Sequence, residues 1–264
     1  MLLAIDIGNT NIKLAVFKDK KILHIWRLDS NKQADTQEYT GLLRRSFTRE
    51  GIKPAAIKEI VICSVVPGLT DILARALDSL LGKKPLVLGK DIIVPLKNLY
   101  KKPEQVGQDR LVSAFAAYKK YGAPLILVDF GTALTFDVVS RQGEYLGGVI
   151  VPGIEVSLNA LMRNAALLPK KIQLTKIGSL LGRDTVSSMQ SGIVYGYAAL
   201  VDGILQRLRK DFKTRPRVIA TGGAVQLIAP YCNLIDSIDT NLTLEGILIT
   251  YENALKQEKK EEKD

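Results

Sequence analysis

The chain contains few of the residues that bind metals or form disulfides. Its 264 residues include two cysteines and one histidine. Cys63 and Cys232 lie in or beside apolar segments, and two lone cysteines argue for a reducing cytosol rather than a disulfide framework. The single histidine and the absence of paired cysteines argue against a zinc-type site. His24 and Trp26 are expected to be structural residues of one strand.

Long hydrophobic runs are also absent. A membrane-spanning helix needs about 20 apolar residues, and no run in this chain approaches that length. The N-terminal apolar run has no basic segment before it and is interrupted by Asp6, unlike a secretory signal. These absences predict a cytoplasmic protein with no membrane partner. The chain lacks the pattern GxxxxGK[ST] as well, so a Walker-type phosphate loop is excluded.

Acidic residues are outnumbered by basic ones, which gives a formal net charge of +10. This charge permits nucleic-acid binding, but it also fits a solvated surface around a site for anionic substrates. The basic residues are scattered and are not interleaved with aromatic ones, which favours the second interpretation. The last nine residues carry four positive and four negative charges and do not supply the excess.

One pattern occurs twice in the chain. LLAIDIGNT begins at Leu2 and LILVDFGTALT begins at Leu125. In each, an apolar run typical of a buried strand ends in Asp, any residue and Gly, with a small polar residue close by. The glycine allows backbone N–H groups to approach an anion, and the Asp can hold a hydrated divalent cation. Two such corners predict a duplicated domain that binds a nucleotide phosphate from both sides.

The rest of the sequence fits the same duplication. Each half is predicted to contain three strands, a helix, a strand, a helix, a strand and a helix. In the first half, the first strand is expected to end near Gly8, and the others are expected at 11–17, 22–28, 59–66 and 85–88. Helices are expected at 36–50 and 69–81. In the second half the strands are expected at 125–130, 134–140, 144–151, 217–220 and 234–238, with helices at 153–168, 185–212, 224–231 and 242–255.

This pattern predicts an α/β fold of two duplicated domains, each a mixed sheet flanked by helices. We expect the first domain at 1–118, the second at 119–255 and a charged tail at 256–264. A helical segment at 109–121 joins the two domains. The active site is expected in the cleft between them, where ligands often bind.

The first corner runs from Asp6 to Lys13, with Asn9 and Thr10 as side-chain donors and Lys13 as a cation for phosphate. In the second corner, which starts at Asp129, Thr132 is the phosphate donor. Two carboxylates that face each other across a cleft repel unless a cation lies between them. A metal–triphosphate complex provides that cation.

Two glycine-rich segments follow strands in the second half. Thr221-Gly222-Gly223-Ala224 stands between a strand and a helix, and its glycine pair suits close approach by adenine or ribose. The segment 147–153, GGVIVPG, lies beside the second corner, and turn chemistry accounts for most of it.

The segment Gly107-Gln108-Asp109-Arg110 has two interpretations. Asp109 is either a helix cap, which is worth about 1 kcal/mol, or a carboxylate that orients and deprotonates an acceptor hydroxyl in phosphoryl transfer. Arg110 can bind an anionic group with two hydrogen bonds. The sequence alone leaves the two interpretations of Asp109 open.

The order of these motifs resembles the acetate and sugar kinase, Hsp70 and actin superfamily, whose domains are actin-like, or ribonuclease H-like. Within it, the chain resembles type III pantothenate kinase along almost its whole length, and the segment of Tyr100 with PEQVGQDR is the discriminating one. The shared motifs are DIGNTNIK from Asp6, SVVP from Ser64, PEQVGQDR from Pro103, DFGTALTFD from Asp129, GGVIVPG from Gly147, MQSGIVYGY from Met189, ATGG from Ala220 and LTLEGI from Leu242.

The resemblance implies ATP-dependent phosphorylation of pantothenate to 4′-phosphopantothenate, the first step of coenzyme A biosynthesis. It further implies ATP with Mg²⁺, a monovalent cation (K⁺ or NH₄⁺) on Asp129, and a homodimer. Asp109 is then the proton acceptor, and Thr132 contacts the ATP phosphates. The first ATP loop is formed by Asp6, Ile7, Gly8, Asn9, Thr10, Asn11, Ile12 and Lys13. The pantothenate pocket is lined by Tyr100, Gly107, Gln108, Asp109 and Arg110, with Thr185 from the partner subunit or the facing helix.

The chain departs from the family pattern at two places. Leu134 stands where a Thr is common, and Arg183-Asp184 replace a more usual Lys-Asn. Two other functions stay open beside the kinase. One is a nucleotide-binding regulator, which the basic charge would suit. The other is a phosphatase, for which Glu144 and Glu155 are weak candidates to position water.

Overall fold

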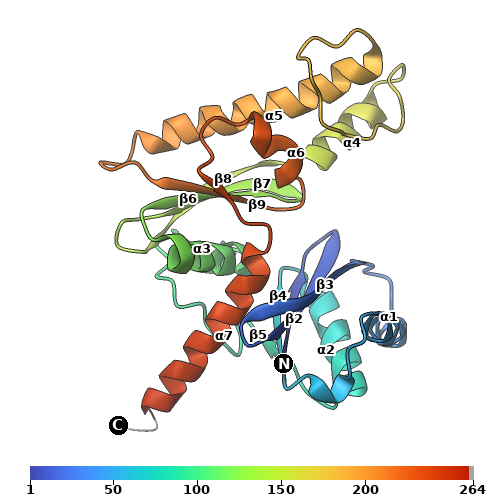
Figure 1. The fold of residues 1–264 in the computed structure, drawn as a ribbon, viewed down its shortest axis with the longest axis vertical. Helices are drawn as coiled ribbons and strands as arrows, with labels where there is room; N and C mark the ends of the chain where they lie inside the picture. The colour runs from blue at the N-terminus through green and yellow to red at the C-terminus, as the bar shows by residue number, and fades with distance from the viewer. Residues whose placement is uncertain (262–264) are drawn as a thin grey trace. The chain divides into compact units, whose positions relative to one another are not determined.

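The computed structural model describes residues 1–261 (Figure 1). The chain divides into two compact units, and each is built around a five-stranded sheet. Unit 1 comprises residues 1–97, 101–116 and those from 242 onward. Unit 2 comprises residues 98–100 and 117–241. The units are therefore not the two consecutive stretches expected from the sequence, because the last helix packs with unit 1.

Unit 1 has the strand order β3-β2-β1-β4-β5, in which β1, β2 and β3 are antiparallel neighbours and β4 and β5 continue in parallel. Its elements are β1 (Leu2–Ile7), β2 (Asn11–Lys18), β3 (Lys21–Asp29), α1 (Thr36–Arg49), β4 (Glu59–Ser64), α2 (Pro67–Leu81), β5 (Leu86–Val87), the first part of α3 (Gln108–Tyr121), and α7 (Leu242–Glu261).

Unit 2 repeats this order as β8-β7-β6-β9-β10, with the same parallel and antiparallel pairings. Its elements are β6 (Leu125–Phe130), β7 (Ala133–Val139), β8 (Tyr145–Pro152), α4 (Ile154–Asn164), α5 (Thr185–Arg209), β9 (Arg217–Thr221), α6 (Val225–Ile228) and β10 (Ser237–Ile238). The matching topologies confirm the predicted duplicated α/β fold.

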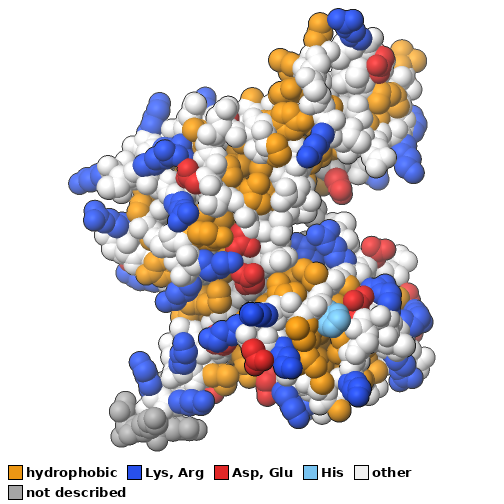
Figure 2. Space-filling model, in the orientation of Figure 1, with side chains coloured by type: hydrophobic (Ala, Val, Ile, Leu, Met, Phe, Trp, Pro, Cys, Tyr) orange, Lys and Arg blue, Asp and Glu red, His pale blue; other side chains and the backbone are white. Residues whose placement is uncertain are grey.

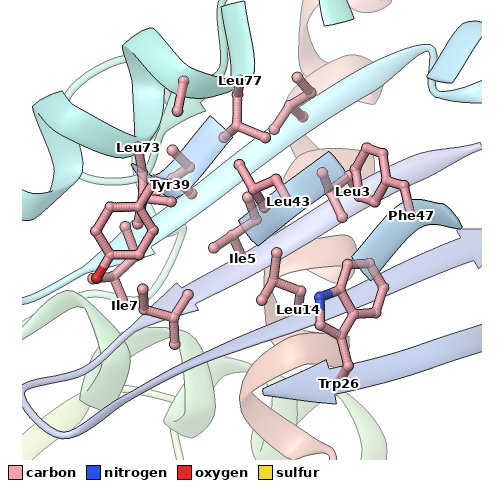
Figure 3. Close-up of a cluster of buried hydrophobic side chains, with 14 of the residues drawn as sticks. Leu3, Ile5, Ile7, Leu14, Trp26, Tyr39, Leu43, Phe47, Leu73 and Leu77 are labelled. Carbon is pink, nitrogen blue, oxygen red and sulfur yellow. The ribbon is translucent and has the colours of Figure 1, made fainter. Parts of the chain in front are cut away.

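The core of unit 1 lies between its sheet and the helices α1 and α2. Because side chains alternate along a strand, Leu3, Ile5 and Ile7 all point into this core (Figure 3). Trp26 lies in the same cluster, edge-on to Phe47, as expected for a structural residue (Figure 3). The alternate residues of β1 face the opposite side, where α7 packs on β1, β4 and β2. Asp6 is one of these alternate residues.

The core of unit 2 is organised in the same way. Helices α5 and α6 cover one face of the sheet, and α5 runs along that face in Figure 1. Val128, Leu134 and Phe136 belong to this apolar cluster. By strand alternation, Asp129 and Thr135 point to the opposite face. That face carries the polar residues of the candidate site in unit 2.

Some elements are shorter than expected. Helix α4 ends at Asn164, with the extended residue Ala165 as its C-cap, and not near 168. The helix expected at 224–231 is the single turn α6 followed by a 3₁₀ turn that contains Pro230, and β10 has two residues. Residues 256–261 of the expected charged tail continue α7, and the other three tail residues lie outside the described part. Within residues 1–261, no helix is long and apolar enough to cross a membrane.

Candidate functional site

The first corner is the turn between β1 and β2. The N–H of Gly8 donates a hydrogen bond to the carbonyl of Asn11 at 3.0 Å, and a Cβ on Gly8 would lie 3.2 Å from that oxygen. The turn places Asp6 directly opposite Lys13 on the neighbouring strand. Because the Gly8 N–H is used inside the turn, phosphate contacts from this corner must come from other groups. The side chains of Asn9, Thr10 and Asn11 in this turn are exposed.

Two of the predicted loop residues have a different role. The side chains of Ile7 and Ile12 are fully buried in the apolar cluster of unit 1. Their side chains pack in the core under the corner, so any contact that these two residues make with ATP is through the backbone. The loop residues with polar side chains carry the remaining chemistry of this segment.

A segment that the sequence analysis missed braces this corner. The Ser30 hydroxyl donates to the carbonyl of Gly8 at 2.7 Å, and the Ser30 N–H donates to the carbonyl of Thr10 at 3.1 Å. Two residues later, the Lys32 ammonium donates to Oδ1 of Asn9 at 3.1 Å. Lys32 thus brings a positive charge to the exposed side of the loop. No local spacing signals this contact, because the two residues are 23 positions apart.

Asp109 lies in the first turn of α3, which begins at Gln108. Its Oδ1 accepts a hydrogen bond from the N–H of the next residue, Arg110, at 2.8 Å. A cap would precede the helix and bind an N–H two or three residues further on, so the cap interpretation is wrong. The carboxylate folds back over Gly107, where a Cβ would collide with Oδ1. Glycine is therefore needed at 107 to leave room for the carboxylate.

The environment of Asp109 favours a proton acceptor. Burial raises the pKa of its carboxyl above the usual 3.8, and the Arg110 N–H and guanidinium oppose that rise. A higher pKa makes a carboxylate a stronger base, provided that it is still ionised at the working pH. The raised pKa is consistent with the general-base interpretation of Asp109.

Asp6 and Asp109 lie in one neighbourhood of unit 1. Burial raises the pKa of the Cys63 thiol far above its usual value, and the charges of Asp6 and Asp109 raise it further. Cys63 is on β4, directly beside Asp6 on β1. A neutral thiol therefore lies beneath the two carboxylates. The sequence places Cys63 in an apolar segment, as a lone cysteine, and does not indicate that it lies beside these carboxylates.

The other predicted residues of this segment differ in orientation. The side chain of Gln108 packs against Gly89, whose φ is +85° and whose Cβ would collide with the amide. Arg110 is half-buried beside Asp109. Gly107, Gln108, Asp109 and Arg110 all belong to unit 1.

The second corner, between β6 and β7, repeats the first. The N–H of Gly131 donates to the carbonyl of Ala133 at 3.1 Å, and Asp129 lies opposite Thr135. The backbone of the exposed Thr132 is held by a hydrogen bond, because its carbonyl oxygen accepts one from the N–H of Gly153 at 3.1 Å. A Cβ on Gly153 would collide with that carbonyl. The glycine that ends GGVIVPG is therefore a packing requirement of the corner as well as a turn residue.

The glycine pair after β9 packs on this second corner. Thr221 is the strand neighbour of Asp129, and Gly222 has φ +101°. A Cβ on Gly222 would collide with Oδ1 of Asp129 and with the backbone of Phe130. The third motif and the second corner thus form one continuous surface in unit 2. The cross-strand partners of Asp129 are two buried threonines, Thr135 and Thr221, which carry hydroxyl oxygens.

Within residues 1–261, no group of three or more His, Cys, Asp and Glu side chains could hold a metal ion. A divalent cation at either corner would therefore depend on phosphate oxygens and water together with a single carboxylate. This arrangement suits a cation that arrives with a nucleotide.

Tyr100 belongs to unit 2, in the short segment 98–100. The N–H of Leu99 donates to the carbonyl of Tyr145 at 2.9 Å, and the Tyr100 N–H donates to Oδ1 of Asn98 at 3.0 Å. The Tyr100 ring lies against Gly147, where a Cβ would be 3.3 Å from the ring. The first glycine of GGVIVPG thus makes room for a residue that was itself expected in the substrate pocket.

Thr185 is the exposed first residue of α5 and lines an open hollow in unit 2. Asp184, one of the two departures from the family pattern, is the N-cap of α5 and forms a capping box with Ser187. The Ser187 hydrogen bonds lower the pKa of Asp184 below 3.8. The hollow is lined by Leu161, Leu168, Gly182, Arg183, Asp184, Thr185, Ser188, Met189, Gly192 and Ile193.

The other departure has little effect on the corner surface. The side chain of Leu134 is buried in the apolar cluster of unit 2, so a hydroxyl at this position would face the core. Glu144, proposed for a phosphatase, lies in the β7–β8 turn, at the opposite end of β7 from Thr132. Glu155 is exposed in the first turn of α4, two residues after Gly153.

Comparison with known proteins places the chain in a family. A model of the family described as type III pantothenate kinase matches residues 2–207, a range that contains both corners, Asp109 and Thr185. The chain belongs to the type III pantothenate kinase family. A type III pantothenate kinase from Geobacter sulfurreducens is 45% identical over 96% of this chain and 98% of its own. One from Bacillus cytotoxicus is 43% identical over 99% of this chain and 100% of its own.

Solved structures share the fold of this type III pantothenate kinase family member. A Campylobacter jejuni protein titled as a Baf family transcriptional activator has a TM-score of 0.57 at 20% identity, with 96% of this chain and 99% of that one covered. The activator of 2-hydroxyisocaproyl-CoA dehydratase from Clostridium difficile, solved with ADPNP, has a TM-score of 0.56 at 13% identity, with 98% and 97% covered. At these identities the likeness concerns the fold alone.

Proposed function

We propose that the protein transfers the γ-phosphate of ATP to the 4′-hydroxyl of pantothenate, the first step of coenzyme A biosynthesis. The observation that carries the proposal is the family match across residues 2–207, supported by relatives of 45% and 43% identity over nearly the whole chain. The geometry of Asp109 fits this reaction, because phosphoryl transfer to an alcohol needs a group that accepts the hydroxyl proton.

In the proposed reaction Asp109 accepts the proton of the pantothenate hydroxyl. The hydroxyl oxygen forms a bond to the γ-phosphorus while the bond from that phosphorus to the bridging oxygen breaks, and ADP leaves. The protein contributes mainly by positioning the reactants and stabilising charge. The N–H of Arg110 holds the Asp109 carboxylate by a hydrogen bond, and the Arg110 charge opposes the rise of the Asp109 pKa.

The two corners are proposed to hold the ATP phosphates. The first corner offers the side chains of Asn9, Thr10 and Asn11 with the cation of Lys13, and the second offers the exposed hydroxyl of Thr132. Asp6 and Asp129 occupy equivalent positions at the ends of β1 and β6. When bound, Mg²⁺ neutralises charge on the transferred phosphate.

A monovalent cation, K⁺ or NH₄⁺, is proposed at Asp129. The support is the oxygen-rich surface formed by Asp129, Thr135 and Thr221 on neighbouring strands of unit 2. Such cations prefer oxygen ligands, which these side chains supply. Tyr100, Gly107, Gln108 and Arg110 are proposed to line the pantothenate pocket.

We further propose that the enzyme works in the cytoplasm as a homodimer in which Thr185 of one subunit reaches pantothenate bound by the other. The support is an apolar surface around α4 and the start of α5. Figure 2 shows hydrophobic side chains gathered over these helices. Leu167, after α4, and Leu181, before α5, are 97% and 76% exposed, and exposed apolar patches often mark protein–protein interfaces.

Phosphate transfer from ATP to pantothenate tests the proposal. Wild type should form 4′-phosphopantothenate, and removal of K⁺ and NH₄⁺ should lower the rate. Asp109→Asn should remove most of the product in both conditions. Absence of product with any cation would overturn the kinase proposal, and DNA binding would then be measured. Figure 2 gives no support to that alternative, since Lys and Arg side chains are scattered over the visible face.

A further inference from the structure

The motif DFGTALTFD ends in an aspartate that the proposed reaction does not use. Asp137, on β7, is 1% exposed. Its Oδ1 accepts a hydrogen bond from the Tyr145 hydroxyl at 2.7 Å, and its Oδ2 accepts one from the Thr135 hydroxyl at 3.2 Å. A buried carboxylate is costly unless it is well bonded. These two hydrogen bonds therefore hold the Asp137 side chain in place inside unit 2.

The hydrogen bond from Thr135 connects Asp137 to the second corner. Thr135 is two residues before Asp137 on β7 and is the cross-strand partner of Asp129. Because strand side chains alternate, Asp129, Thr135 and Asp137 share the face opposite the apolar cluster. The carboxylate of Asp137 thus orients the hydroxyl next to the proposed cation ligand.

The hydrogen bond from Tyr145 connects Asp137 to the proposed pantothenate pocket. Tyr145 is fully buried, its hydroxyl bonded to Asp137 and its carbonyl bonded to the N–H of Leu99. Asn98 forms a β-bridge with Tyr145, and the ring of Tyr100 rests on Gly147. The segment 98–100 is outside every helix and named strand, and the part of the chain on either side of it belongs to unit 1. Its place in unit 2 therefore depends on Tyr145.

We propose that Asp137 is a positioning residue that holds Tyr100 in place for pantothenate by fixing Tyr145. This inference rests on the proposed function. It predicts that the loss of the Asp137–Tyr145 bond weakens pantothenate binding much more than ATP binding. A residue that served only the stability of unit 2 would not separate the two substrates in this way.

Steady-state kinetics of Asp137→Asn and Tyr145→Phe provide the first test. Each variant should raise KM for pantothenate about 10-fold or more, because a buried charged hydrogen bond is lost or weakened. In Tyr145→Phe, which leaves the Asp137–Thr135 bond in place, KM for ATP should stay within about 2-fold of wild type. Asp202→Asn is the matched control. Asp202 is also a carboxylate of unit 2 that accepts N–H bonds, but it lies on α5 and its bonds come from Asn233 and Leu234.

Limited trypsin digestion provides a second test that needs no activity. Lys101 is exposed directly after Tyr100, and cleavage after the next lysine, Lys102, is blocked by Pro103. Asp137→Asn and Tyr145→Phe should therefore speed cleavage after Lys101, with release of a fragment of residues 1–101, while Asp202→Asn should not. Pantothenate should slow this cleavage in wild type.

The two tests separate the inference from the proposed function. If wild type makes no 4′-phosphopantothenate, the proposed function fails, and the inferred role in pantothenate binding fails with it, although digestion still reports whether Asp137 holds the segment. If wild type is active but both variants keep wild-type KM values and digestion rates, the positioning role is overturned. Equal changes in KM for both substrates, or equal changes in Asp202→Asn, would also overturn it.

Discussion

At the scale of single residues, Asp109 combines two properties that conflict. Its burial raises the carboxyl pKa, which makes the ionised form a better base but costs stability. When burial raises a carboxyl pKa, the folded state keeps its full stability below the unfolded pKa and loses stability as the pH rises through the raised folded pKa. Above its raised pKa the buried Asp109 carboxylate therefore lowers the stability of unit 1. The proposed role as proton acceptor would account for a carboxylate at this costly position.

Asp109→Asn should lower turnover about 10²- to 10⁴-fold, the usual contribution of a general base. The variant should melt at the same temperature as wild type or higher at neutral pH, because an amide avoids the cost of burying a charge. In wild type, kcat/KM should fall as the pH drops through a pKa above 3.8, and the variant should lose this limb. Calorimetry and pH–rate profiles give the measurements, with the exposed Asp71→Asn as the control. A folded variant with wild-type turnover would contradict the assignment.

Lys32 supports a second prediction at this scale. Its ammonium lies on Asn9 in the first corner, so it adds positive charge where ATP phosphates are proposed to bind. Lys32→Met should raise KM for ATP about 5-fold, with kcat and KM for pantothenate nearly unchanged. The exposed Lys53→Met serves as the control for loss of one charge in the same unit. An unchanged KM for ATP in Lys32→Met would leave Lys32 with a structural contact only.

At the scale of elements, the sequence predicts best what a short stretch of chain determines. The corners follow from apolar runs that end in Asp and Gly within a few residues, and β1, β2, β6 and β7 lie where expected. The structure shortens the helix expected at 224–231, where a 3₁₀ turn with Pro230 follows α6, and the strand expected at 234–238, which is limited to Ser237–Ile238. The contact between Tyr100 and Gly147 joins residues far apart in sequence, so no local pattern could indicate it.

The start of α5 gives a prediction about an element. Asp184 accepts the N–H and hydroxyl of Ser187, and these bonds lower its pKa below 3.8. Its contribution to stability is therefore present above pH 3.8 and is lost as the pH falls through the lowered pKa. Asp184→Ala should lower the melting temperature at neutral pH, and the difference from wild type should shrink on acidification. Asp184→Asn, which keeps the cap, should melt close to wild type. A pH-independent difference would contradict the capping account.

At the scale of the whole molecule, the duplication accounts for the paired corners and also for their difference. Asp6 and Asp129 occupy the same position in two identical strand orders, yet Asp6 faces Lys13 and Asp129 faces Thr135. The cross-strand partner is thus a cation in the first corner and a hydroxyl in the second, which agrees with the different roles proposed for the two corners. The sequence could predict the two copies but not the composition of the units. The placement of residues 98–100 and of α7 depends on contacts between distant segments.

The proposed homodimer can be tested by a change that does not touch the corners. Leu181→Asp places a charge on the exposed apolar surface at the start of α5, where a second copy is proposed to pack. Wild type should have twice the mass of one chain by light scattering, and the variant should shift to a single chain. Because Thr185 is proposed to act across the dimer, the monomeric variant should also have a raised KM for pantothenate.

Ile93→Asp is the matched control, since Ile93 is 71% exposed and belongs to unit 1, whereas Leu181 belongs to unit 2. It should stay dimeric with wild-type kinetics. A wild-type protein that is monomeric at assay concentrations, yet fully active, would show that the site is complete within one chain. A dimeric Leu181→Asp with unchanged mass would place the interface elsewhere. Loss of the dimer together with a change in KM for pantothenate alone would link the apolar surface to Thr185.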